Sequence, residues 1–106
     1  MELSEKHEIE ARIVEVLRTI YDPEIPVNIY DLGLIYEINL DNARTAHITM
    51  TLTAPNCPMA EDLFEEVKYK ISEMEGVKDV EVKLTFNPPW DKSMLSDEAK
   101  LDLGFL

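Results

Sequence analysis

Two neighbouring stretches of the chain alternate apolar and polar residues with a period of two. In residues 34–40 and 46–53 the apolar positions are Leu34, Tyr36, Ile38 and Leu40, followed by Ala46, Ile48, Met50 and Leu52. This alternation is typical of a sheet with one covered face and one face in water. The turn-forming residues 41–44 lie between the two stretches, so we predict a β-hairpin here.

Helical periodicity flanks this hairpin on both sides. We predict a first helix that is capped by Ser4 and ends at Tyr21, before Asp22 and Pro23. A second helix is predicted after Pro58, with Gly76 as its C-terminal cap. Its apolar stripe consists of Met59, Leu63, Val67, Ile71 and Met74.

A third strand is predicted over residues 79–86, with Val80, Val82, Leu84 and Phe86 facing one way. Prolines extend the chain after this strand. Trp90 is expected to pack over the edge of the core, and the alternative is an aromatic contact to a partner. Ser96 is expected to cap a short last helix that ends at Lys100 or Leu101. The element order is α-β-β-α-β with a short C-terminal helix. We therefore predict one α/β domain over residues 1–106, an α+β two-layer fold. Its small mixed or antiparallel sheet would carry both main helices on one face.

The composition restricts the partners that this chain can have. Its net charge is −12, which disfavours nucleic acid and anionic membrane surfaces, and no basic patch interrupts the acidic residues. No apolar run is long enough to span a bilayer, and the N-terminus lacks the apolar core of a signal peptide. A cytoplasmic protein is therefore expected. The single cysteine excludes an internal disulfide.

That cysteine, Cys57, precedes Pro58, and proline favours the first position of a helix. Cys57 is thus predicted at or beside an N-cap, where unpaired N–H groups and the helix dipole stabilise a thiolate. The alternative is a buried, inert side chain, because free cysteine is often a small apolar filler. Both interpretations remain open on the residues alone.

One cysteine limits the metal chemistry of the chain. Closed zinc sites need four ligands, and iron–sulfur clusters usually take four thiolates. Only His7 and His47 could add nitrogen ligands, and neither has a ligand-like spacing to Cys57. The remaining roles for Cys57 are a transient metal ligand, the carrier of a cluster shared with a partner, or a nucleophilic thiol. A homodimer would offer two thiolates, which is still an open site.

The loop before the hairpin contributes three acids, Asp22, Glu24 and Asp31. Carboxylates can hold a metal or act as acid and base. Asp before Pro and Asp two residues before Gly are also good Asx-turn placements, and taken alone these acids favour turns. Thr53 continues the threonine face of the second strand toward Cys57, where its hydroxyl could orient the thiol.

Three segments together resemble the SufT/PaaD-type family of iron–sulfur maturation proteins, whose domain is MIP18-like. They are Asp22-Pro23-Glu24 through Asp31-Leu32-Gly33-Leu34, then residues 53–58, then Phe86-Asn87-Pro88-Pro89-Trp90. The resemblance implies an α/β domain related to cluster-assembly scaffolds. It also implies a non-enzymatic role in delivering clusters to apoprotein targets together with the assembly machinery. It matches Cys57 to the family's cysteine, Thr53 to its loop threonine, and Asp22, Glu24 and Asp31 to its acidic loop. Pro58 is counted with this supporting pocket.

Departures from the family narrow the prediction to a stand-alone SufT-like factor. PaaD-like proteins, which serve a multicomponent oxygenase, usually carry a cysteine-rich tail, and this sequence shows none. A P-loop motif and a C-x-x-C pair are also absent. The cofactor expected is a transient iron–sulfur cluster on Cys57 with no tightly held group. The alternatives are a PaaD-like adaptor subunit and an enzyme that uses Cys57 in thiol or persulfide chemistry.

Overall fold

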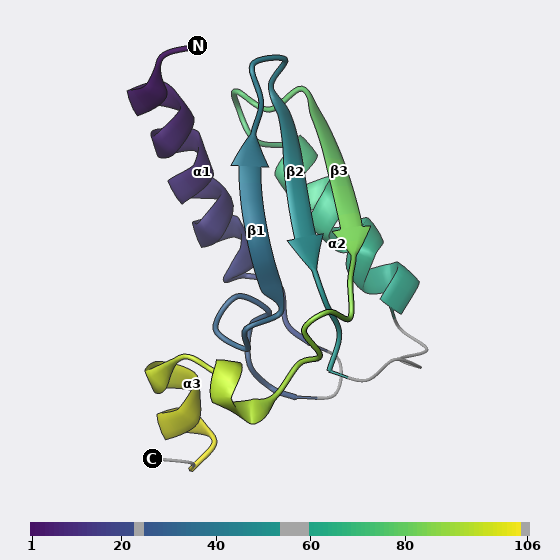
Figure 1. The fold of residues 1–106 in the computed structure, drawn as a ribbon. Coiled ribbons are helices and arrows are strands. Elements are labelled where there is room, and N and C mark those ends of the chain that lie inside the picture. The colour runs from purple at the N-terminus through teal and green to yellow at the C-terminus, as the bar shows by residue number, and fades with distance from the viewer. Residues whose placement is uncertain (23–24, 54–59, 105–106) are drawn as a thin grey trace.

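The computed structural model describes residues 1–22, 25–53 and 60–104. Figure 1 shows a three-stranded sheet with one long helix beside β1 and a second helix behind the sheet. The elements in chain order are α1 (Leu3–Leu17), β1 (Ile35–Leu40), β2 (Thr45–Met50), α2 (Ala60–Ser72), β3 (Asp79–Leu84), a 3-10 turn η1 (Lys92–Met94) and α3 (Asp97–Asp102). The predicted element order and the α+β class are confirmed.

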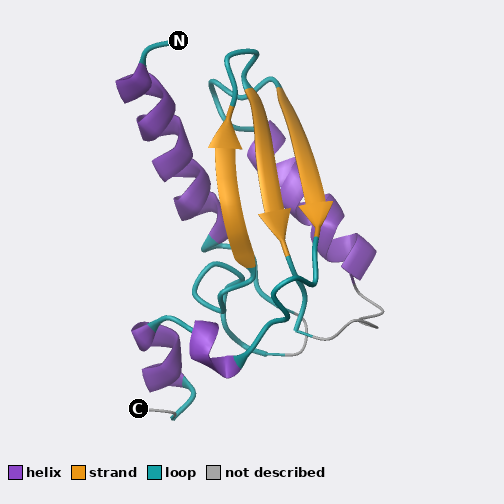
Figure 2. Cartoon of the chain, viewed as in Figure 1, coloured by secondary structure: helices purple, strands orange, loops and turns teal. Residues whose placement is uncertain are grey.

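The sheet is mixed, with the strand order β1-β2-β3 (Figure 2). The β1–β2 hairpin is antiparallel, and Ile38 lies opposite Ile48. β2 and β3 are parallel, with Ile48 opposite Val82. A parallel pair needs a long crossover connection, and α2 supplies it between the two strands.

The hairpin turn closes where the sequence predicts it. One Asp41 carboxylate oxygen accepts hydrogen bonds from the N–H groups of Ala43 and Thr45, both at 2.9 Å. Arg44 adopts a φ of 65°, the left-handed conformation that such a tight connection requires. The turn therefore fixes the hairpin register that puts Leu40, Ala46, Ile48 and Met50 on the covered face. Tyr36, which the alternation assigns to that face, lines a groove on the other one, because the register shifts between Ile35 and Glu37.

Both main helices cover the same face of the sheet, as predicted. Their buried residues form one apolar core with the covered face of the strands: Ile9, Ile13, Leu17, Leu63, Val67, Ile71, Leu40, Ala46, Ile48 and Met50. Gly76 has a φ of +92°, but it lies four residues beyond Ser72, in the turn whose Val77 N–H donates to the Met74 carbonyl. The prediction of Gly76 as the C-terminal cap of α2 is therefore wrong, because the helix ends one turn earlier. In the described part of the chain, no helix is long and apolar enough to cross a membrane.

The first helix differs from its prediction at both ends. Its N-cap is Glu2 and no side chain caps it, so the prediction of Ser4 as the cap is wrong. It ends at Leu17 and not at Tyr21, because the chain turns to pair with the following loop. Tyr21 forms an isolated antiparallel bridge with Asn28, and the Ile29 N–H donates to the Ile20 carbonyl at 2.8 Å. Backbone pairing here overrides the helical periodicity.

The third strand is shorter than predicted, and its last apolar residues are not covered. β3 ends at Leu84, and Leu84 and Phe86 are both 41% exposed. Val80 and Val82 pack against the core, as predicted. The prediction for α3 is confirmed within a residue or two: Ser96 is its N-cap, and its hydroxyl accepts a hydrogen bond from the Ala99 N–H at 3.1 Å.

Candidate functional site

One end of the molecule brings together the segments that the sequence marks as functional. β1 begins there, β2 and β3 end there, and α3 and η1 lie below them (Figure 1). The loop that precedes β1 and the chain after β3 also occupy this end. Cys57, Glu24 and Pro58 lie outside the described residues. The predicted residues that can be placed are Asp22, Asp31 and Thr53.

Asp22 is only 7% exposed, and both its side chain and its backbone form hydrogen bonds within the loop. Its Oδ2 accepts a hydrogen bond from the Ile25 N–H at 2.9 Å. Its own N–H donates to the Val27 carbonyl at 3.3 Å. These contacts support the turn-forming interpretation of Asp22.

Asp31 is 8% exposed and is held from three directions. Its Oδ2 accepts from the Asn28 amide at 2.7 Å, and its Oδ1 lies 3.8 Å from the Arg18 guanidinium. Its backbone carbonyl accepts from the Ser96 N–H at 2.8 Å. The Asx-type contact in this turn comes from Asn28, whose Oδ1 accepts from the Asp31 N–H, so the expectation that Asp31 itself supplies it is wrong.

The threonines at alternate positions in β2 and just after it differ in how exposed they are to solvent. Thr49 and Thr53 are partly exposed, whereas Thr51 between them is fully buried. The Thr51 hydroxyl has no hydrogen-bond partner among the described residues. A buried hydroxyl without a partner costs free energy, and this orphan group lies two residues before Thr53.

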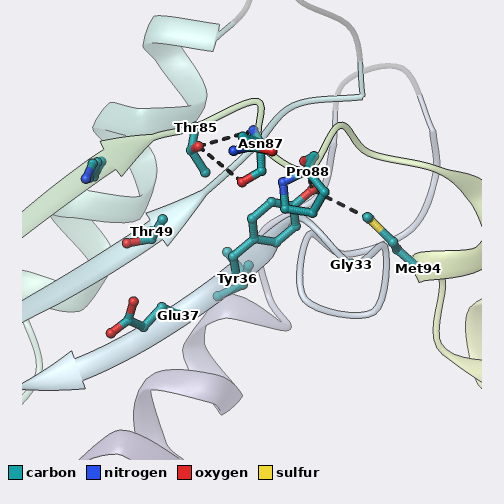
Figure 3. Close-up of a pocket in the computed structure, with 10 residues that line it drawn as sticks. Gly33, Tyr36, Glu37, Thr49, Thr85, Asn87, Pro88 and Met94 are labelled. Carbon is teal, nitrogen blue, oxygen red and sulfur yellow. Dashed lines mark hydrogen bonds between the residues drawn. The ribbon is translucent and has the colours of Figure 1, made fainter.

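The sheet face opposite the helices carries a groove that the sequence analysis missed. Its volume is about 730 Å³, and it is lined by Gly33, Ile35, Tyr36, Glu37, Thr49, Lys83, Thr85, Asn87, Pro88 and Met94. Figure 3 shows Tyr36, Pro88 and Met94 together at one end of the groove, with Glu37 and Thr49 further along β1 and β2. The polar half of the strand alternation was the available signal, because it marks the open face.

An irregularity in the hairpin register places Tyr36 at one end of the groove. The register shifts between Ile35 and Glu37, which leaves Tyr36 as an extra residue on β1. Its hydroxyl donates to the Pro88 carbonyl at 2.7 Å and contacts the Met94 sulfur at 3.5 Å. The chain after β3 is thereby fastened across the end of the sheet.

Two further contacts hold this C-terminal segment in place. The Trp90 indole N–H donates to the Leu32 carbonyl at 2.7 Å, and the partly buried ring packs against the core, as expected. Gly33 has a φ of +86°, and a Cβ at this position would overlap the Met94 carbonyl. A glycine is thus needed both for the backbone angle and for the close approach of η1.

The two histidines of the chain lie far from this end. His7 is in the first half of α1, and His47 is near the start of β2, at the hairpin end of the sheet (Figure 1). A hydrogen bond to Asp41 at 2.8 Å raises the pKa of His47, and the same contact lowers the pKa of Asp41. Neither imidazole is placed to serve as a base or ligand beside Thr53. No metal-binding group of His, Cys, Asp and Glu occurs among the described residues.

The sequence of this chain matches an established protein family. A family model described as "Iron-sulfur cluster assembly protein" matches residues 10–84, from α1 to the end of β3. That match covers most of the chain, which therefore belongs to the iron–sulfur cluster assembly protein family. The resemblance drawn from the loop, cysteine and proline motifs is confirmed.

Individual relatives extend the match beyond the family model. The chain is 56% identical over 97 residues to an "Fe-S protein maturation auxiliary factor" of Porphyromonas gingivalis, covering 92% of each protein. It is 41% identical over 96 residues to the "Fe-S protein maturation auxiliary factor YitW" of Bacillus subtilis, covering 91% of this chain and 94% of the relative. The crystal structure of a DUF59 domain from Bacillus anthracis superposes with a TM-score of 0.91 at 36% identity, covering 99% of this chain and 100% of that one.

Proposed function

We propose that this protein is an accessory factor that delivers iron–sulfur clusters, or their components, to apoproteins. Cys57 would be the transient ligand or sulfur acceptor, and the cluster would be cargo. The observation that carries the proposal is the near full-length similarity to proteins named Fe-S protein maturation auxiliary factor, at up to 56% identity. Residues 1–106 would act as one domain.

The few possible cluster ligands of this chain favour a site that is completed by a partner protein over a site that the chain forms alone. An iron–sulfur cluster usually takes four thiolates, and the chain has one cysteine. Both histidines lie toward the hairpin end, and His47 is engaged by Asp41 and Glu81. Ligands beyond Cys57 would therefore come from the assembly machinery or from the apoprotein that receives the cluster.

The same geometry favours a carrier over a thiol enzyme. Thiol catalysis usually pairs the cysteine with a base, and histidine is the usual one. Neither histidine is near Thr53, which precedes Cys57 by four residues. Asp22 and Asp31, the two predicted acids that the structure describes, are buried and hydrogen-bonded within their own loop. They would shape the supporting pocket together with Glu24, Thr53 and Pro58.

Anaerobic reconstitution with iron and sulfide tests this proposal. The wild-type protein, mixed with a cysteine-donating apoprotein, should acquire the visible absorption of an iron–sulfur chromophore. Cys57→Ala should abolish that signal, and Thr49→Ala, on the open sheet face, should retain it. An equal signal from wild type and Cys57→Ala would overturn the carrier role and leave an adaptor. Turnover of a small persulfide substrate would favour the enzyme alternative.

A further inference from the structure

The outer edge of β3 is open for pairing. Within the described residues β3 pairs only with β2, and α2 lies behind the sheet (Figure 1). The Thr85 N–H donates to the Met50 carbonyl at 2.9 Å, so the odd-numbered residues of this strand turn their backbone groups toward β2. Because these directions alternate along a strand, Val80, Val82 and Leu84 turn theirs outward. Exposed edges of this kind can accept a further strand.

The sequence of β3 is complementary to itself in one antiparallel register. With Val82 on a two-fold axis, Glu81 lies opposite Lys83 of a second copy, and this pair occurs twice. In the same register Val80 lies opposite Leu84 of the second copy, and both residues have outward-facing backbone groups. Moving the two-fold axis by one residue, which shifts the register by two, would place Glu81 opposite Glu81 or Lys83 opposite Lys83. Opposite charges across a pair of strands stabilise it, and like charges destabilise it.

In that same register, exposed side chains of the two copies would contact each other. A cavity of about 390 Å³ between α2 and β3 is lined by Glu65, Lys68, Tyr69, Ser72, Asp79 and Val80. Tyr69 is 65% exposed and Leu84 is 41% exposed. Because Leu84 of the second copy would lie opposite Val80, it would reach the cavity beside Tyr69. Two unusually exposed large side chains would thus cover each other, twice per dimer.

We propose that a second copy of this chain docks on the free edge of β3 and joins the two sheets into one. Both open-face grooves would lie on the same side of the joined sheet. Since the two copies of β3 run in opposite directions, the two Thr53 residues would lie at opposite ends of the dimer. If the chain delivers clusters as proposed above, the dimer would present two separate sites of transfer, one at each end.

Two features of the chain oppose dimerisation, and one of them predicts how dimerisation depends on the salt concentration. The Asp79 carboxylate accepts a hydrogen bond from the Val80 N–H at 2.9 Å, and this contact must give way to the incoming strand. Each copy has a net charge of −12, so two copies repel each other at long range. Salt screens such repulsion, with a Debye length of about 10 Å at 0.1 M. Dimerisation should therefore strengthen as the salt concentration rises.

Charge reversal across the strand pair is the test, measured by sedimentation equilibrium of the full chain over a range of concentrations. Glu81→Lys and Lys83→Glu each place like charges opposite in both pairs. Each variant alone should weaken the dimer about tenfold or more. An equimolar mixture of the two variants should recover wild-type association, because every pair across the strands is again Glu with Lys. Asp102→Lys, on α3, is the control with the same charge change as Glu81→Lys.

Circular dichroism of each variant separates loss of pairing from loss of fold. Recovery in the mixture, with no loss in Asp102→Lys, supports pairing through β3. A wild-type protein that stays monomeric at all concentrations and salt levels overturns the proposal. A dimer that is insensitive to both single variants also overturns it, because its interface would lie elsewhere. A monomer that binds only a different protein through this edge would likewise contradict a second copy as the occupant.

Discussion

The two faces of the sheet use the same three strands for different purposes. On the face toward the helices, Leu40, Ala46, Ile48 and Met50 are at most 1% exposed. On the other face, Glu37, Thr49 and Lys83 lie side by side along one groove. Alternate residues of one strand therefore either pack in the core or contact solvent. Substitutions one position apart should have effects of very different size, which makes the contrast testable.

The largest effect is expected for Ile48→Ala on the covered face. Ile48 is 1% exposed within the core, and its truncation leaves a cavity that should cost about 3 kcal/mol of unfolding free energy. The neighbouring Thr49→Ala should change it by less than about 0.5 kcal/mol, because Thr49 lies in the groove. Urea denaturation measures both. Equal losses in the two variants would mean that the faces do not differ as described.

The next effect tests how the C-terminal segment is anchored at the end of the sheet where β1 begins. Gly33→Ala should lower the unfolding free energy by about 2 kcal/mol, through the positive φ and the overlap with the Met94 carbonyl. Gly104→Ala is the matched control, since Gly104 has a φ of +79° and nothing near its missing Cβ. A loss no greater in Gly33→Ala than in Gly104→Ala would show that the close approach of Met94 is not needed.

A smaller effect is expected for Trp90→Phe. This change keeps an aromatic ring at the edge of the core and removes the hydrogen bond to the Leu32 carbonyl. Net loss of such a bond should cost about 1 kcal/mol. Hydrogen exchange in residues 91–95 should accelerate more than exchange in β2. Unchanged exchange there would mean that Trp90 does not fasten this segment to the loop before β1.

The smallest effect is the pH dependence of the pair at the hairpin end. The pKa of His47 is raised by Asp41, so its contribution is complete below its ordinary pKa of about 6.5 and is lost as the pH rises through the higher folded value. The pKa of Asp41 is lowered, so its contribution is lost in acid, as the pH falls through the lower folded value. Unfolding experiments at pH 5.5 to 8.5 should show this loss in wild type and not in His47→Gln. An identical pH dependence in both proteins would contradict the assignment.

The local signals in the sequence predicted most of the fold. The hairpin, both main helices and the Ser96 cap depend on residues close together in the chain. The predictions that failed depended on distant contacts. Helix α1 ends early because Ile20 pairs with Ile29. Leu84 is exposed because none of the described elements covers the end of β3. Periodicity shows that a strand has two faces, but it does not show how far a covering element extends.

For the candidate site, too, the local features could be predicted from the sequence and the long-range ones could not. The acidic loop was recognisable from its residues, and Asp22 does form a turn there. The groove was not, because it depends on contacts between positions more than fifty residues apart, such as Tyr36 with Pro88. The Thr51 hydroxyl, which has no hydrogen-bond partner within residues 1–22, 25–53 and 60–104, is also buried by tertiary packing. A threonine in an alternating strand gives no sign of it.

The most direct test of the central claim is cluster-dependent activation of an apoenzyme under anaerobic conditions. The apoenzyme would be mixed with a loaded scaffold and limiting amounts of this protein, and its activity followed over time. Wild type and Thr49→Ala should accelerate activation, and Cys57→Ser, checked for an intact fold, should not. Acceleration by Cys57→Ser equal to that of wild type would contradict a delivery role that works through the single thiol.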